Sequence, residues 1–167
     1  MGVHHFKLSL LPKAYFQRIG LPVPSVLTAE DIDLGESVDT GWWSSLQPSE
    51  QAVTRLRRLC PADSSWGEPE AVVTTEPWGS DLRIWREQGR VWLVTFRFSP
   101  SADARALLDQ FVAIARDEQC LLLDGQTGAL FEPDDRAVSE RLESSRAMRL
   151  VRDTRGAIIE ASRETQQ

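Results

Sequence analysis

Residues 74–98 have the sequence TTEPWGSDLRIWREQGRVWLVTFRF. Gly79 and Gly89 supply the backbone freedom that tight reversals need, and they separate runs that are rich in aromatic and β-branched residues. The pattern predicts a meander of three strands, with residues 71–76 forming the first, 82–86 the second and 91–98 the third. Both faces of the third run are mostly apolar, which is typical of a central strand.

The tryptophans of this stretch have a structural interpretation. Trp85 and Trp92 fall on neighbouring strands near the same turn, where rings packed across strands stabilise the pairing by ~0.2–1 kcal/mol. The stretch is therefore predicted to form the centre of a sheet. Arg83 and Arg97 are its only residues that suggest binding chemistry.

The flanking segments add helices and further strands. Residues 6–10 alternate apolar and polar side chains, as in a half-buried strand. Apolar stripes predict helices over residues 48–60 and 102–117, and the second should cover one face of the sheet. Two short strands flank GQTG at residues 125–128, and Asp134 or Asp135 caps a last helix.

The order of these elements predicts the fold class. One strand, a long loop and a helix are followed by the order β-β-β-α-β-β-α, which is typical of an α+β domain with a largely antiparallel sheet backed by helices. We expect a single domain over residues 1–152 and a C-terminal extension over residues 153–167.

Composition narrows the classes of function. The chain has 167 residues, a net charge of −6 and a hydrophobic fraction of 41%, which indicates a globular protein. No basic stripe is present, so nucleic acid is not expected as a partner. No run approaches ~18 consecutive apolar residues, so no membrane span is expected, and a cytoplasmic location is predicted. Cys60 and Cys120 are too far apart in sequence to suggest a zinc site or a disulfide framework.

A long acidic segment is the strongest candidate for binding. Residues 20–41 are predicted to form an irregular loop, and no basic residue occurs between Arg18 and Arg55. Such a segment would attract a cationic protein. Its acidic residues are Glu30, Asp31, Asp33, Glu36 and Asp39.

Two adjacent tryptophans follow this segment. Side chains next to each other diverge by about 180° on a strand and by about 100° on a helix, so Trp42 and Trp43 should not share one core face. One of them is expected to be exposed as an aromatic anchor for the partner. In the alternative interpretation, one ring lies in the main core and the other lies under the loop.

Two other classes of function remain open. The first is an anion-binding or small-molecule module, in which guanidinium groups converge in a pocket; its candidate residues are Arg83, Arg97, Arg146 and Arg149. The second is an enzyme that uses paired carboxylates, with Glu132, Asp134 and Asp135 as candidates. With only His4 and His5 available, neither a metal site nor a nucleophile-base pair can be built easily, and no cofactor is expected.

Several strings resemble a known class of proteins. The segments FKLSLLPKAYF, WGSDLRIW, VTFRFSPSAD and LLDGQTGALFEPD, with the WW pair, are similar to those of small bacterial α+β proteins, some of which resemble immunity proteins encoded beside toxins. The resemblance implies a non-enzymatic protein that occludes a partner, such as a basic toxin or effector, with an acidic or aromatic surface.

Overall fold

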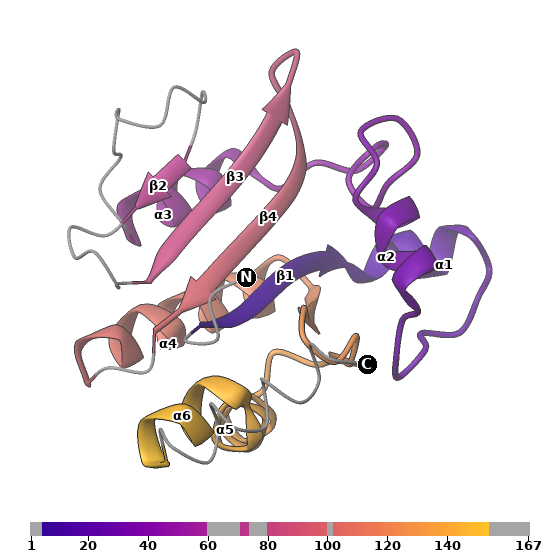
Figure 1. Ribbon diagram of the computed structural model, residues 1–167. Coiled ribbons are helices and arrows are strands. Elements are labelled where there is room, and N and C mark those ends of the chain that lie inside the picture. Colours follow the sequence, from indigo (N-terminus) through magenta and orange to yellow (C-terminus); the bar gives the residue numbers. More distant parts are fainter. Residues whose placement is uncertain (1–4, 60–70, 74–79, 100–101, 154–167) are drawn as a thin grey trace.

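One antiparallel sheet organises the protein. The computed structural model describes residues 5–59, 71–73, 80–99 and 102–153, and within them the sheet has six strands in the order β2-β3-β4-β1-β5-β6 (Figure 1). The strands are β1 (Phe6–Pro12), β2 (Ala71–Val73), β3 (Asp81–Glu87), β4 (Arg90–Phe98), β5 (Cys120–Asp124) and β6 (Leu130–Phe131). The helices are α1 (Lys13–Arg18), α2 (Ala29–Gly35), α3 (Glu50–Leu59), α4 (Ala102–Asp117), α5 (Asp135–Ser144) and α6 (Arg146–Arg152). The predicted α+β fold with a largely antiparallel sheet is confirmed.

Strands β4 and β1 form the centre of the sheet. β4 pairs with β3 on one side and with β1 on the other, as the sequence predicts for residues 91–98. β1 also has two neighbours, β4 and β5, and Lys7 is its only residue that is not buried. The expectation of a half-buried first strand is therefore wrong, because other parts of the protein cover both faces of the sheet along β1.

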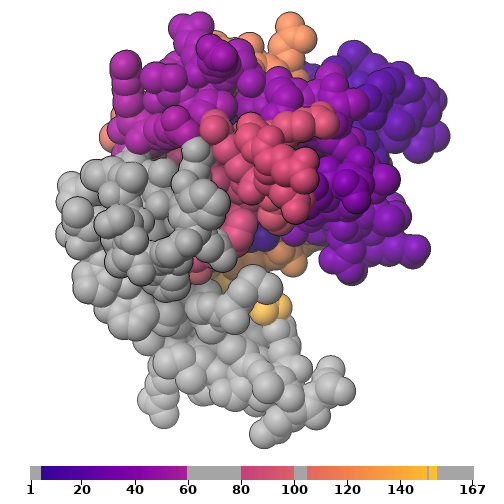
Figure 2. Space-filling view, turned by 90° about the horizontal axis from the view of Figure 1, so that it is seen from above, coloured from indigo at the N-terminus to yellow at the C-terminus, as the bar shows by residue number. Residues whose placement is uncertain are grey.

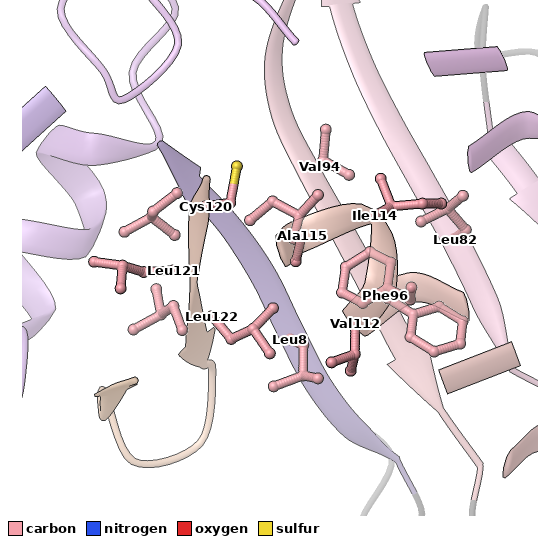
Figure 3. Packing of buried hydrophobic residues seen from close by; sticks show 14 of the residues in the cluster. Leu8, Leu82, Val94, Phe96, Val112, Ile114, Ala115, Cys120, Leu121 and Leu122 are labelled. Carbon is pink, nitrogen blue, oxygen red and sulfur yellow. The ribbon is translucent and has the colours of Figure 1, made fainter. Parts of the chain in front are cut away.

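Helix α4 packs on one face of the sheet and contributes to the main core. Val112, Ile114 and Ala115 point from α4 towards the strands (Figure 3). Phe111 is fully buried, and its ring centroid lies 4.9 Å from that of Phe96 on β4. The helix expected over residues 102–117 and its contact with the sheet are both confirmed.

The β3–β4 hairpin has the predicted reversal and one irregularity. Gln88 and Gly89 both have positive φ angles, of 50° and 79°, as a tight hairpin turn requires. The strand register shifts between Trp85 and Arg86, and the ring centroids of Trp85 and Trp92 lie 5.6 Å apart. The predicted ring packing across these strands is confirmed. The predicted turn at Gly79 lies outside the described residues.

The C-terminal helical region differs from the prediction of one helix. Asp134 caps α5 as expected, because its carboxylate accepts hydrogen bonds from the backbone amides of Arg136 and Ala137, at 3.0 Å each. The chain then breaks at Ser145, whose ψ of 155° is extended. The Ser145 hydroxyl accepts a hydrogen bond from the Met148 amide and so caps the separate helix α6. The last residues of the predicted C-terminal extension, 154–167, lie outside the described residues.

Candidate functional site

The acidic segment is more ordered than its sequence suggests. Its middle forms the helix α2, so the prediction of an irregular loop over residues 20–41 is wrong there. Thr28 begins the helix with a reciprocal capping box: its hydroxyl accepts from the Asp31 amide, and its own amide donates to the Asp31 carboxylate at 2.9 Å. The Thr28 hydroxyl also donates to the Asp31 carboxylate at 2.7 Å, and this bond, followed by the bond from the Thr28 amide, lowers the pKa of Asp31 below its ordinary value.

Contacts with the edge of the sheet hold the start of this segment. Val26 forms an isolated antiparallel bridge with Ala129, next to β6. The Leu27 amide donates to the Gly128 carbonyl at 2.8 Å, and the Leu130 amide donates to the Ser25 carbonyl at 2.9 Å. Gly128 has a φ of 72°, and its approach to Leu27 is so close that a Cβ there would lie 2.4 Å from the Leu27 carbonyl oxygen. The turn between β5 and β6 therefore anchors residues 25–27.

Both tryptophans after α2 belong to the interior. Trp42 and Trp43 are each only 2% exposed, so the expectation that one of them is exposed is wrong. The Trp42 ring fills the space beside Gly35, where an added Cβ would lie 2.0 Å from the ring. The Trp43 indole donates to the Leu10 carbonyl of β1 at 3.1 Å. The alternative interpretation, with one ring in the main core and the other under the segment, agrees with the burial of both rings.

An apolar groove lies between α1 and α2, and Trp42 is part of its lining. Its volume is about 480 Å³. Phe16, Leu27 and Trp42 are buried residues of its lining. The remaining residues that line it are Tyr15, Ile19, Leu21, Pro22, Pro24, Asp31 and Leu34. In Figure 1, α1 and α2 lie together beyond the end of β1, on the side of the molecule away from α3 and β2.

Exposed apolar side chains concentrate around this groove. Among the residues that the structure describes, seven large hydrophobic side chains are exposed, and six of them fall between residues 19 and 38. Leu21 and Leu34 are 60% and 59% exposed. The seventh, Val151, is 61% exposed and lies on α6. Ile19, Leu21 and Leu34 line the groove, and Val38 lines a second hollow. Single exposed apolar side chains need no explanation, but a contiguous group such as the three at the groove is a candidate interaction surface.

The predicted acidic residues divide into three groups. Asp31 lines the groove, and Glu30 and Asp33 are exposed on the same helix. Glu36 forms an ion pair with Lys7 of β1 at 3.7 Å, which ties the end of α2 to the sheet. Asp39 lies away from the groove. Of the five predicted carboxylates, Asp31 alone lines the groove, and Glu30 and Asp33 lie on the same helix.

A second, smaller hollow lies between the β3–β4 hairpin and the chain that follows α2. These two segments adjoin in the view of Figure 2. The hollow has a volume of about 280 Å³, and Asp39, Glu87 and Arg90 are among its charged lining residues. Next to it, the side-chain amide of Gln47 accepts a hydrogen bond from the Val91 backbone amide at 2.8 Å. The same side chain donates one to the Val91 carbonyl at 3.0 Å. The Gln47 side chain thus pairs with the Val91 backbone as a neighbouring strand would, so this contact supports the fold.

The arginines of the anion-binding alternative are brought together only in part. The guanidinium groups of Arg83 and Arg97 converge on Asp81, whose side chain is 3% exposed, and both form ion pairs with it. Arg146 and Arg149 are exposed on α6. Neither of the two hollows is lined by any of these four residues. Arg83 on β3 and Arg97 on β4 are therefore brought together by their ion pairs with the buried carboxylate of Asp81.

The carboxylates of the enzyme alternative each have a structural partner. Glu132 pairs with Lys13 at 2.5 Å, and Asp135 pairs with Arg116 at 3.1 Å. Asp134 caps α5. Within the described residues, no group of three or more His, Cys, Asp or Glu side chains is arranged to hold a metal ion.

The described cysteine is an interior thiol. Cys120 is fully buried on β5, and burial, followed by the nearby charge of Glu118, raises the pKa of its thiol to about 12. A thiol with such a pKa is protonated and unreactive at neutral pH. Cys60 lies outside the described residues.

Comparisons with protein-family models, with curated proteins and with solved structures found no match to this chain. Among the described residues, no helix has the length and hydrophobicity needed to cross a bilayer.

Sequence reasoning missed the apolar part of this surface. The acidic residues dominated the interpretation of residues 20–41, although Leu21, Val23, Val26, Leu34 and Val38 occur among them. Prolines and glycines interrupt this apolar set, so it has neither the period of a strand nor that of a helix. The one local signal was Thr28 followed by Asp31 three residues later, which resembles a capping box and would have indicated α2.

Proposed function

We propose that the protein is a binding module for another protein, and that residues 19–38 carry the contact surface. The gathering of exposed apolar side chains on this segment is the observation that carries the proposal. Leaving them in water is unfavourable by roughly 25 cal/mol for each Å² of apolar surface, and a partner would remove this cost.

The base of the surface suits it to binding. Trp42 packs on Gly35, Trp43 bonds to β1, and Leu27 bonds to the turn before β6. These contacts fix the groove on the central sheet, so little conformational entropy is lost when a partner docks. The binding energy would come from the apolar groove and the association rate from the acidic residues.

The immunity or inhibitor class fits this proposal. A protein of that class acts by covering a surface of its partner, which requires a docking face and no catalytic residues. We therefore propose a basic toxin or effector as the partner that this chain occludes.

Site-specific photocrosslinking tests the proposed function. A photoreactive amino acid at Leu34 should trap one defined partner when the full chain is expressed in the cells it comes from. The matched control carries the same group at Val151, which is equally exposed but lies on α6. Equal labelling from both positions, no labelling from either, or capture only of a second copy of this chain would contradict the proposal.

A further inference from the structure

We infer that the groove between α1 and α2 binds a short basic segment of the partner that presents two or three large apolar side chains between Lys or Arg residues. The inference rests on the proposed function and specifies the chemistry of the ligand. It follows from the shape of the groove, the position of the charges and the net charge of the chain.

The shape of the groove sets the apolar part of the ligand. A volume of about 480 Å³ falls within the roughly 300–1,000 Å³ of typical ligand pockets, which accommodates a few side chains. Phe16 and Trp42 offer it aromatic surface, and Leu21 and Leu34 stand exposed at its margin. Large apolar side chains would replace water mainly at Leu21 and Leu34, because Phe16 and Trp42 are only 4% and 2% exposed.

The charges beside the groove set the polar part of the ligand. Residues three or four apart share a helix face, so Glu30 and Asp31, which lie four and three residues before Leu34, are on the side of α2 that carries Leu34. Aspartate is charged at neutral pH, and the bonds to Thr28 lower the pKa of Asp31 further. Basic residues on either side of the apolar side chains would therefore meet carboxylates at the groove margin.

The same charges argue against other occupants. A second copy of the chain would bring an identical acidic segment and a net charge of −6 towards the groove. Like charges brought together at an interface oppose association. Nucleic acid would be repelled for the same reason. The structure thus favours a basic partner protein over self-association.

A panel of four labelled peptides of equal length tests the inference. The first peptide combines Leu and Phe with Lys and Arg. The second and third keep Leu and Phe but replace the basic residues with Glu and with Ser, respectively. The fourth keeps the basic residues and replaces Leu and Phe with Ser. Fluorescence anisotropy with the full chain should show that the first peptide binds about tenfold or more tightly than each of the others. Its affinity should fall as salt rises, because the exposed charges are screened.

Variants place this binding on the molecule. Leu34→Ser should weaken binding of the first peptide about tenfold, and Val151→Ser, with equal exposure on α6, should leave it unchanged. Glu30→Gln should weaken binding and reduce its salt dependence, whereas Asp31 is kept because its carboxylate is part of the capping box of α2. Circular dichroism confirms that each variant is folded.

The outcomes separate this inference from the proposed function. Equal binding of the basic, neutral and acidic apolar peptides, lost in Leu34→Ser, would overturn the inferred ligand chemistry and leave the docking surface in place. Binding that survives Leu34→Ser would overturn the assignment to the groove. No binding of any peptide would overturn the inference, while crosslinking from position 34 would still support a protein partner.

Discussion

At the scale of single residues, the tryptophan pair shows that an expectation based on strand or helix periodicity fails where the chain turns. The expectation that adjacent side chains diverge applies to regular strands and helices. Here the chain turns instead: the Trp42 amide donates to the Gly35 carbonyl and the Gly41 amide donates to the Ser37 carbonyl, each at 2.9 Å. Both rings therefore enter the interior, and their contribution to binding is indirect.

Replacing Trp43 by Phe should reduce stability without affecting binding. The change removes the donor to the buried Leu10 carbonyl, which costs about 1–3 kcal/mol when the acceptor is left without a partner. Trp43 does not line the groove, so affinity for the basic apolar peptide should equal that of the wild type. Urea unfolding and fluorescence anisotropy measure the two quantities.

The control for this variant is Trp85→Phe, on a half-buried position of β3. It should lose less stability than Trp43→Phe. An unchanged free energy of unfolding in Trp43→Phe would show that the buried hydrogen bond contributes nothing, and a tenfold loss of affinity in the folded variant would place Trp43 at the binding surface.

At the scale of elements, the long elements with strong hydrophobic periodicity were predictable from the sequence. The short capped helices were not. The apolar character of both faces of β4 and the broad stripe of α4 are long signals, and the structure confirms both elements. Helix α2 has seven residues, three of them acidic, so the hydrophobic pattern is almost absent. The break between α5 and α6 was hidden for the opposite reason, because the apolar positions continue across Ser145 while its hydroxyl caps a new helix.

Removing the cap of α2 should loosen that helix alone. Thr28→Ala deletes the hydroxyl that accepts from the Asp31 amide, and loss of such a cap costs about 1 kcal/mol. Hydrogen exchange of the α2 amides should accelerate, with little change in β4. The control, Thr54→Ala at an exposed interior position of α3, should leave exchange in α2 unchanged.

The acid dependence of the same helix has a defined sign. The folded pKa of Asp31 is lowered, so the stability contributed by its charged form is present at neutral pH and is lost as the pH falls through that pKa. Protection of α2 should therefore decline on acidification below the ordinary aspartate range. Exchange in α2 that is unaffected by Thr28→Ala would show that packing on Trp42, not the cap, holds the helix.

At the scale of the whole molecule, the sheet is a platform that supports one unusual segment. β1 leads directly into α1. The chain around α2 is held by hydrogen bonds to the turn before β6 and to Leu10, and by an ion pair with Lys7. These contacts join residues distant in sequence, which is why the pattern of the chain predicted the sheet but not the groove. The predicted acidic surface was found in part, since Asp31 lines the groove and Glu30 shares the helix face of Leu34, while Asp33, Glu36 and Asp39 do neither.

Nuclear magnetic resonance mapping tests the central claim, that the groove between α1 and α2 is the docking surface. Titration of the basic apolar peptide into isotope-labelled protein should shift amide signals of α1, α2 and the chain between them, with the largest changes near Leu21 and Leu34. Signals of the β3–β4 hairpin and of Val151 should stay in place. Shifts centred on the hairpin hollow or on α6, with α1 and α2 unperturbed, would contradict the account.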